Sequence, residues 1–250
     1  MKVLITGASS GIGKSLAIEF ARTGYDLVLV ARSKDKLKEV KEIIGDKVHV
    51  ELYPIDLSDI NNCIKLHNDI KDIDILVNNA GFGLFGEFTD TVIDKELAMI
   101  DINIKVLHYL MKLYLCDMVK KDKGHILNVA SIAGFMPGPL MSTYYATKNY
   151  VVSLSEAVRE ELRKSKSKVK ISILCPGPVE TNFDNVAGVS FSLKGKSSED
   201  VAKYTVDKLK KGKFYIVPGW DIKVLRILNF FIPSSLITRI VYYQQRKKNK

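Results

Sequence analysis

Residues 2–13 read KVLITGASSGIG, an apolar run that ends in three glycines, Gly7, Gly11 and Gly13. The next residues, KSLAIEFARTG, have the apolar spacing of a helix. A strand, a tight glycine turn and a helix N-terminus in succession place free backbone N–H groups and the positive end of a helix dipole at one point. This point suits a pyrophosphate, because a Cβ in place of glycine would block the approach of phosphate to the backbone. The pattern predicts a nucleotide-binding turn.

The same residues permit another interpretation. Gly7 to Gly11 also satisfies G-x-S-x-G, the nucleophile turn of α/β-hydrolases, with Ser9 as the nucleophile. In that fold an acidic residue and then a histidine follow the serine along the chain. The second half of this chain has no histidine, since the four are His49, His67, His108 and His125. A serine hydrolase is therefore a remote alternative.

Apolar runs alternate with helix-period segments along the whole chain. This alternation predicts an α/β fold, a single doubly wound domain with a seven-stranded parallel sheet and helices on both faces. The expected strands are 3–6, 27–31, 48–53, 75–78, 125–130, 170–175 and 214–217. The expected helices are 14–23, 36–44, 60–71, 92–121, 142–164 and 198–211. We expect residues 1–219 to form the dinucleotide-binding and catalytic domain and residues 220–250 to form a helical extension.

Composition argues against several other classes of protein. The chain has 250 residues and a formal net charge of +10, but its lysines are spread along helix-like segments without an aromatic-basic motif, so no nucleic-acid partner is expected. Cys63, Cys116 and Cys175 are widely spaced and have no nearby His, which predicts neither a disulfide framework nor a metal site. The sequence opens on a strand rather than on a signal peptide, so a cytoplasmic location is expected.

Arg32 follows the second expected strand, about nineteen residues after Gly13. An NAD site places an acidic residue there to bind the ribose 2′-hydroxyl. A carboxylate would repel a 2′-phosphate, whereas a guanidinium bonds it with two hydrogen bonds. The sequence therefore predicts NADP (NADPH) in preference to NAD, and the alternative is an exposed arginine at the end of a strand.

Further polar residues lie after the other strands. Asp56 and Leu57 follow the third expected strand, the segment from Asn78 to Gly81 follows the fourth, and Ser131 follows the fifth. All are expected at the carboxyl edge of the sheet, where ligands bind in such folds. Tyr144 and Lys148 are four residues apart and share one face of a helix, while Tyr145 points away from that face.

These motifs, in this order, resemble the short-chain dehydrogenase/reductase family over Met1 to roughly Gly219. The resemblance rests on TGASSGIG at residues 6–13, NNAG at 78–81, Asn103, Ser131, the Y-x-x-x-K pair and Pro176-Gly177 before Thr181. It implies a catalytic set of Asn103, Ser131, Tyr144 and Lys148. Ser131 would hydrogen-bond the carbonyl oxygen, Tyr144 would act as acid and base, Lys148 would lower the tyrosine pKa and bind ribose, and Asn103 would complete a proton relay through a water.

The resemblance also implies a cofactor site, to which Tyr144 and Lys148 belong. The pyrophosphate would contact Gly7, Ser9, Ser10, Gly11, Ile12 and Gly13, and the 2′-phosphate would contact Arg32. Asp56 and Leu57 would flank adenine, Asn79, Ala80 and Gly81 the adjacent ribose, and Pro176, Gly177, Val179 and Thr181 the nicotinamide. Ser9 and Ser10 are also candidates for simple helix caps.

The activity so predicted is the NADPH-dependent interconversion of a carbonyl and an alcohol by a homodimer or homotetramer. The stretches 82–88, 134–141 and 183–195 should border the substrate, and their apolar side chains favour a hydrophobic ketone or aldehyde, or simply loop packing. A non-catalytic NADP-binding sensor or scaffold is the alternative function.

Residues 221–250 carry two apolar stripes and a basic end. The stripes are Val224, Leu225, Leu228 and Phe231, then Ile237, Ile240 and Val241, and the basic residues are Arg246, Lys247, Lys248 and Lys250. Arg226, Pro233 and Arg239 interrupt the segment too often for it to span a bilayer. Two possibilities stay open: the extension lies on an anionic membrane, or it packs on the body or on a partner subunit.

Overall fold

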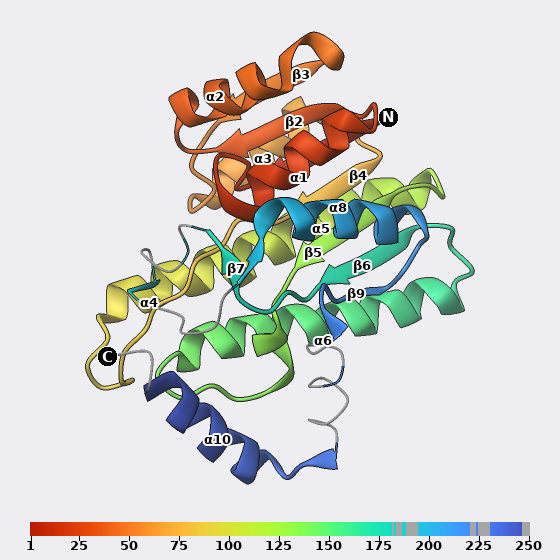
Figure 1. Cartoon of the computed structure of the whole chain (residues 1–250). Coiled ribbons are helices and arrows are strands. Elements are labelled where there is room, and N and C mark those ends of the chain that lie inside the picture. Colours follow the sequence, from red (N-terminus) through yellow and green to blue (C-terminus); the bar gives the residue numbers. More distant parts are fainter. Residues whose placement is uncertain (182, 184–186, 189–194, 221–223, 225–230, 247–250) are drawn as a thin grey trace.

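The chain was analysed as a computed structural model, which describes residues 1–181, 183, 187, 188, 195–220, 224 and 231–246. Within these residues, strands form one parallel sheet of seven in the order β3-β2-β1-β4-β5-β6-β9 (Figure 1). Its strands are β1 (Lys2–Thr6), β2 (Asp26–Ala31), β3 (Val50–Pro54), β4 (Ile75–Asn78), β5 (His125–Val129), β6 (Lys170–Leu174) and β9 (Tyr215–Ile216). The predicted doubly wound sheet is confirmed, and all seven expected strands are present with small shifts at their ends.

The helices alternate with these strands along the chain, as βαβ units require. They are α1 (Gly11–Arg22), α2 (Lys34–Ile44), α3 (Ile60–Asp69), α4 (Ile93–Ile100), α5 (Leu107–Lys120), α6 (Ser142–Lys164), α8 (Ser198–Lys210) and α10 (Ser234–Arg246). The described residues also contain two short 3₁₀ turns, η1 (Gly45–Lys47) and η3 (Ile132–Phe135), and a π turn, η2 (Asp101–Val106). Helix α8 has Ser197 as its N-cap, and the Ser197 side chain accepts from Asp200 N at 3.0 Å.

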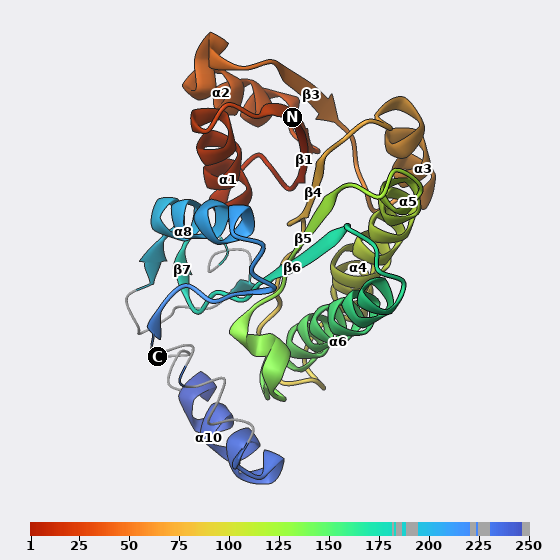
Figure 2. The same cartoon turned by 90° about the vertical axis from the view of Figure 1, so that its right-hand side faces the viewer.

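The core consists of two apolar layers, one on each face of the sheet (Figure 2). On one face, Leu16 and Phe20 of α1 pack with residues of α2 and α8. On the other face, Leu66 of α3 packs with Leu110 of α5 and Val151 of α6. The central strands are buried on both sides, as parallel strands between two helical layers must be, and this explains their continuous apolar runs. The layers hold the carboxyl ends of the strands in place.

The segment expected as one helix over 92–121 is interrupted in the structure. Helix α4 ends at Ile100, the π turn η2 covers residues 101–106, and α5 begins at Leu107. A π turn accommodates an additional residue without ending the helical path, so the apolar periodicity continues across it. Such turns are frequent at functional sites, and this one contains Asn103.

A second parallel pair, β7 (Val179–Glu180) with β8 (Lys196–Ser197), lies outside the main sheet. The sequence did not predict it, because strands of two residues have no periodicity of their own and form only when distant segments meet.

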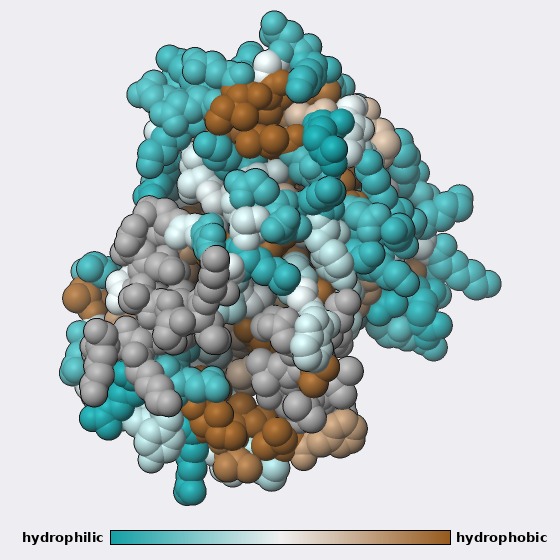
Figure 3. All heavy atoms as spheres, viewed as in Figure 1, coloured by the Kyte–Doolittle hydropathy of each residue, from teal (hydrophilic) through white to brown (hydrophobic). Residues whose placement is uncertain are grey.

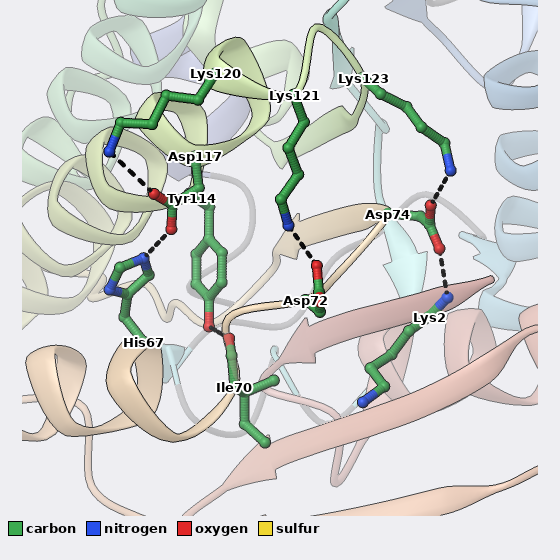
Figure 4. Close-up of polar contacts among 10 residues, drawn as sticks. All are labelled: Lys2, His67, Ile70, Asp72, Asp74, Tyr114, Asp117, Lys120, Lys121 and Lys123. Carbon is green, nitrogen blue, oxygen red and sulfur yellow. Dashed lines mark hydrogen bonds and ion pairs between the residues drawn. The ribbon is translucent and has the colours of Figure 1, made fainter.

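Ion pairs join the loops at the amino-terminal edge of the sheet, opposite the polar segments (Figure 4). Lys123 contacts Asp74 at 2.8 Å, and the other carboxylate oxygen of Asp74 accepts from Lys2 N at 2.9 Å. Lys121 pairs with Asp72 beside them. Exposed pairs of this kind contribute only about 0–1 kcal/mol each to stability, so the two core layers provide most of the stability of the fold.

Helix α10 packs on the body of the protein, beyond the end of the sheet (Figure 1). Ile237 and Val241 are buried against Met136, with Ile132 and Tyr145 also in contact. Ile240, expected on the same stripe, is exposed. Leu225, Leu228, Arg226, Lys247, Lys248 and Lys250 lie outside the described residues. No helix in the described part of the chain is both long and apolar enough to cross a bilayer.

Candidate active site

The glycine turn after β1 is closely packed. Gly7 and Gly11 have φ angles of +66° and +51°, in the region that favours glycine. A Cβ on Gly13 would lie 2.2 Å from the carbonyl oxygen of Gly7 and 2.5 Å from Nδ2 of Asn79. The turn therefore folds onto itself and onto the segment after β4, and a side chain at Gly13 has no space.

Hydrogen bonds join this turn to the segment after β4. Thr6 Oγ1 accepts from the backbone N–H groups of Asn79 and Ala80, both at 3.0 Å. Asn79 Nδ2 donates to the carbonyl oxygens of Thr6 at 3.0 Å and Gly7 at 3.2 Å. The structure thus brings together residues that the sequence predicted for one cofactor site, from segments more than 70 positions apart.

The N-terminus of α1 has the features of an anion site. Ser10 occupies the N-cap position, but its side chain makes no capping hydrogen bond, and the first turn contains no acidic residue. The helix-cap alternative for Ser10 therefore has no support, and no carboxylate offsets the positive end of the helix dipole. Thr181 approaches the same turn, because its Cγ2 lies 3.2 Å from a Cβ built on Gly11. A cofactor pyrophosphate fits these residues.

Further along the carboxyl edge of the sheet, the ends of β2 and β3 lie beside each other. Ile55 N donates to Ala31 O at 3.0 Å, so Arg32 and Asp56 follow neighbouring strand ends. Arg32 is exposed and makes no ion pair within the described residues. Leu57 is buried, and Asp56 Oδ1 accepts from Ser58 N at 3.0 Å. The predicted adenine and 2′-phosphate residues therefore share one edge.

Ser131, Tyr144 and Lys148 lie together where β5 ends and α6 passes. The Ser131 side chain lies close enough to the Tyr144 hydroxyl to lower the pKa of that tyrosine. Lys148 Nζ donates to the carbonyl oxygen of Val129 at 3.0 Å and lies 5.8 Å from the centre of the Tyr144 ring. Tyr145 packs against the α10 residues Ile237 and Val241, a contact that its helical position did not predict. The three predicted side chains therefore form one contiguous group.

Burial has opposite effects on the two titratable members of this group. It raises the pKa of Tyr144, and the hydrogen bond with Ser131 lowers that pKa only in part. Burial lowers the pKa of Lys148 to about 8. The expected lowering of the tyrosine pKa by Lys148 is therefore not the net result in this structure, because desolvation of the phenolate outweighs the other contributions.

Asn103 is fixed by hydrogen bonds in the π turn η2. It is buried, its Nδ2 donates to Phe82 O at 2.9 Å and to Thr147 Oγ1 at 3.1 Å, and its Oδ1 accepts from Phe82 N at 3.1 Å. A Cβ on Gly81 would lie 2.7 Å from Asn103 Oδ1 and 3.7 Å from Lys148 Nζ. Asn103 therefore connects the segment after β4 with α6, near Lys148.

Sequence reasoning missed Thr147. Its buried hydroxyl donates to Tyr144 O at 2.7 Å and accepts from Asn103, so it joins two of the predicted catalytic residues. Nothing in the local sequence distinguishes this threonine from one on an ordinary helix.

The remaining predicted cofactor residues follow β6. Pro176 O accepts from Ile132 N at 2.9 Å, which fixes the Pro176-Gly177 segment against the turn that begins at Ser131. Val179 lies in β7, and Thr181 Oγ1 accepts from Phe183 N at 3.2 Å. This segment thus connects the catalytic group with the glycine turn.

The three stretches expected to border the substrate meet beside Tyr144. Phe85 N donates to Ala187 O at 3.0 Å, and Gly86 N donates to Leu140 O at 2.9 Å. The Phe183 ring lies 5.4 Å from the Tyr144 ring, centre to centre. The apolar cluster here, which we call the substrate-border cluster, consists of Phe85, Met141, Tyr144, Tyr145, Phe183 and Ala187. Phe191, also expected here, lies outside the described residues.

Comparison with known families decides the class of protein. Residues 1–188 match the sequence model of the family described as short chain dehydrogenase. The chain belongs to the short-chain dehydrogenase family. Its members include the oxidoreductases described next, so this chain is an NAD(P)-dependent dehydrogenase or reductase with a Rossmann-type fold. This assignment to the dehydrogenase family replaces the serine hydrolase that the sequence allowed as a remote alternative.

Three relatives give the extent of the likeness. Very-long-chain 3-oxoacyl-CoA reductase of Rattus norvegicus is 39% identical over 181 residues, which are 68% of this chain and 57% of that protein. A short-chain dehydrogenase from Sphingobium yanoikuyae in complex with NADPH superimposes with a TM-score of 0.82 at 32% identity, over 88% of each chain. One from Burkholderia phymatum in complex with NAD gives 0.83 at 25% identity, over 91% of this chain and 92% of the other.

Proposed function

We propose that this short-chain dehydrogenase is an NADPH-dependent carbonyl reductase, with alcohol oxidation as the reverse reaction. The observation that carries the proposal is the contiguous group of Ser131, Tyr144 and Lys148 at the same sheet edge as the glycine turn. An enzyme of this type needs a hydrogen-bond donor for the carbonyl oxygen, a proton donor and a dinucleotide within reach of both.

A bound nicotinamide supplies the hydride in reduction and accepts it in oxidation. Negative charge then develops on the substrate oxygen, and Ser131 stabilises it with a hydrogen bond from its hydroxyl. Tyr144 delivers a proton to the same oxygen. The Ser131 side chain lies near enough to Tyr144 to lower its pKa, so in this proposal one substrate oxygen reaches both hydroxyls.

Lys148 and Asn103 support the proton transfer in this proposal. Because the pKa of Lys148 is about 8, its ammonium can lose and regain a proton near neutral pH. A cation close to the phenol favours the phenolate that remains after the proton has left. Asn103, fixed to Phe82 and Thr147, holds the end of a relay that returns the proton from solvent.

We assign the cofactor as NADPH on the basis of Arg32. Its guanidinium is exposed at the end of β2, beside the strand end that carries Asp56, and is available for a 2′-phosphate. Gly7, Ser9, Ser10, Gly11, Ile12 and Gly13 hold the pyrophosphate, Leu57, Asn79, Ala80 and Gly81 the adenosine half, and Pro176, Gly177, Val179 and Thr181 the nicotinamide.

The proposed substrate is a hydrophobic ketone or aldehyde. The substrate-border cluster is apolar apart from its tyrosine hydroxyls, so it offers no charge that would bind a carboxylate or phosphate. The name of the rat relative, a 3-oxoacyl-CoA reductase, supports a carbonyl on an acyl-like chain.

We further propose a cytoplasmic homodimer or homotetramer, with residues 1–219 as the catalytic domain and 220–250 as an extension that contacts an anionic membrane surface. Cys63, Cys116 and Cys175 are not joined by disulfide bonds, which supports a reducing compartment. Phe88, Ile93 and Leu97 are exposed apolar residues on and before α4, and they support contact with a second copy.

A screen of ketones and aldehydes for loss of NADPH absorbance, followed by Tyr144→Phe, tests the proposed reaction. We expect kcat to fall by about 10²- to 10⁴-fold, the usual contribution of a general acid, while NADPH affinity is unchanged. Tyr150→Phe, on the same helix, is the matched control and should retain activity. A Tyr144→Phe enzyme with most of its kcat would refute the mechanism, and NADPH binding without turnover of any carbonyl would favour the sensor.

A further inference from the structure

The C-terminal helix reaches the border of the active site through one hydrogen bond. Gln245, in the last turn of α10, is 2% exposed, and its Nε2 donates to the hydroxyl of Tyr145 at 2.8 Å. Tyr145 is the immediate neighbour of Tyr144, and the two rings lie 6.1 Å apart, centre to centre. A residue 100 positions away in sequence therefore contacts the neighbour of the proposed acid.

Tyr145 has apolar neighbours on two sides. On one side it packs with Met136, Ile237 and Val241, the cluster that attaches α10 to the body. On the other side it belongs to the substrate-border cluster. One side chain therefore separates α10 from the residues around Tyr144.

The surroundings of Tyr145 leave its ring little freedom. A Cβ on Gly138 would lie 2.2 Å from Cγ of Tyr145, so the ring lies flat against this glycine. Asn149 Nδ2 donates to the carbonyl oxygens of Tyr145, Ala133 and Met136 at 2.8 to 3.1 Å, which fixes the backbone on both sides of the ring. The hydrogen bond from Gln245 then fixes the outer end of the ring.

Packing alone does not explain a glutamine at position 245. Its Oε1 is buried and has no hydrogen-bond partner among the described residues. A buried polar atom without a partner destabilises a fold, and an apolar side chain of similar size would avoid this effect. Local violations of this kind are expected where a residue serves function.

We propose that Gln245 is a positioning residue for substrate choice: it holds the Tyr145 ring at the edge of the substrate-border cluster and so limits the size of the group attached to the substrate carbonyl. This inference rests on the proposed carbonyl reductase activity. It gives the C-terminal extension a role in the active site, because α10 then determines the position of the Tyr145 ring.

Substrates of different length test this role. We compare kcat/KM for a short and a long 2-alkanone in the wild type and in Gln245→Leu, with Gln244→Leu as the matched control, since Gln244 is exposed on the same turn. We expect the ratio of long to short to rise by roughly tenfold in Gln245→Leu, mainly through KM, since a freed ring admits more methylenes. Tyr145→Ala should move the ratio further in the same direction, and Gln244→Leu should leave it unchanged.

A second variant separates positioning from folding. Tyr145→Phe combined with Gln245→Leu removes both polar partners together, so it should unfold at a temperature near that of the wild type and still show the raised ratio. An unchanged ratio in both Gln245→Leu and the double variant, or an equal loss of kcat for both ketones, would overturn the role of Gln245. Turnover of the short ketone by the wild type tests the proposed function separately.

Discussion

At the scale of single residues, the proposed acid and its neighbouring cation are each held toward their neutral forms. Burial raises the pKa of Tyr144 and lowers that of Lys148 to about 8. In the proposed mechanism, a charge on one residue stabilises the opposite charge on the other. The distance of 5.8 Å from Lys148 Nζ to the ring is short enough for this coupling.

The cofactor preference is a residue-scale prediction because one side chain decides it. Arg32→Asp replaces a bidentate donor by a carboxylate that repels the 2′-phosphate. We expect kcat/KM with NADPH to fall by roughly 10- to 100-fold, in line with a lost charge-assisted hydrogen bond, while kcat/KM with NADH is retained or rises. Lys41→Asp makes the same charge change at the far end of α2 and should alter neither value. An unchanged NADPH to NADH ratio in Arg32→Asp would refute the assignment.

Residue spacing predicted only part of this site. Tyr144 and Lys148 lie on one face because helical periodicity places residues four apart together, and the three glycines have the steric role that the motif requires. Thr147 escaped prediction, because its role depends on Asn103 from another helix. The net direction of the Tyr144 pKa also escaped, because desolvation depends on side chains that meet only in the folded chain.

At the scale of elements, the π turn η2 gives Asn103 its place. The apolar pattern over 92–121 predicts a continuous helix, and the chain is indeed helical on both sides of the turn, in α4 and α5. The additional residue of a π turn leaves no mark in that pattern, so the sequence could not locate it. The polar contacts of Asn103 with Phe82 and Thr147 are what the turn makes possible.

Gly13→Ala tests the glycine turn as an element. The new Cβ would meet a backbone oxygen at 2.2 Å, and no side-chain rotation relieves that collision, so the turn must open. We expect NADPH affinity, measured by the fluorescence of the bound cofactor, to fall by roughly tenfold or more. We also expect a lower temperature of unfolding in a thermal melt.

Gly45→Ala is the control for this variant. Gly45 has a φ of +66°, but a Cβ there meets nothing within 4 Å, so alanine adds strain without collision. Its cost should be about 1–3 kcal/mol of stability, because its backbone (φ +66°, ψ −158°) lies in a region that essentially only glycine occupies, with unchanged NADPH affinity. Equal NADPH affinity in Gly13→Ala and the wild type would contradict a close approach of phosphate to this turn.

At the scale of the whole molecule, the apolar sequence pattern predicted the βαβ units, which repeat along the chain. The strand and helix alternation predicts the doubly wound sheet because each βαβ unit has the same chain order and burial. The β7–β8 pair was not predicted and the docking of α10 was left open, since both depend on contacts between segments distant in sequence. For α10 the sequence left membrane contact and packing on the body open, and the structure shows that the inner face packs on the body.

The outer face of α10 differs in character from the surface around the sheet. Leu236, Ile240 and Tyr243 are 50%, 45% and 65% exposed on successive turns, and Figure 3 shows apolar side chains gathered over this end of the molecule. Residues 222–250 contain no acidic residue and seven basic ones, namely Lys223, Arg226, Arg239, Arg246, Lys247, Lys248 and Lys250. An apolar stripe on a segment whose charged residues are all basic is complementary to an anionic lipid surface.

Vesicle binding by the full chain tests the proposed membrane contact. We expect co-sedimentation with vesicles of phosphatidylcholine and phosphatidylserine, weaker binding to phosphatidylcholine alone, and loss of binding as salt rises, because each basic residue contributes about 1 kcal/mol at an anionic surface. Ile240→Ser should reduce binding severalfold, since it removes an apolar group from the stripe. Ile43→Ser is the matched control, because Ile43 is also exposed but lies on α2, at the other end of the molecule. Equal vesicle binding by Ile240→Ser and Ile43→Ser would contradict the membrane contact. An oligomer that dissociates only in Ile240→Ser would likewise assign the outer face of α10 to a protein partner.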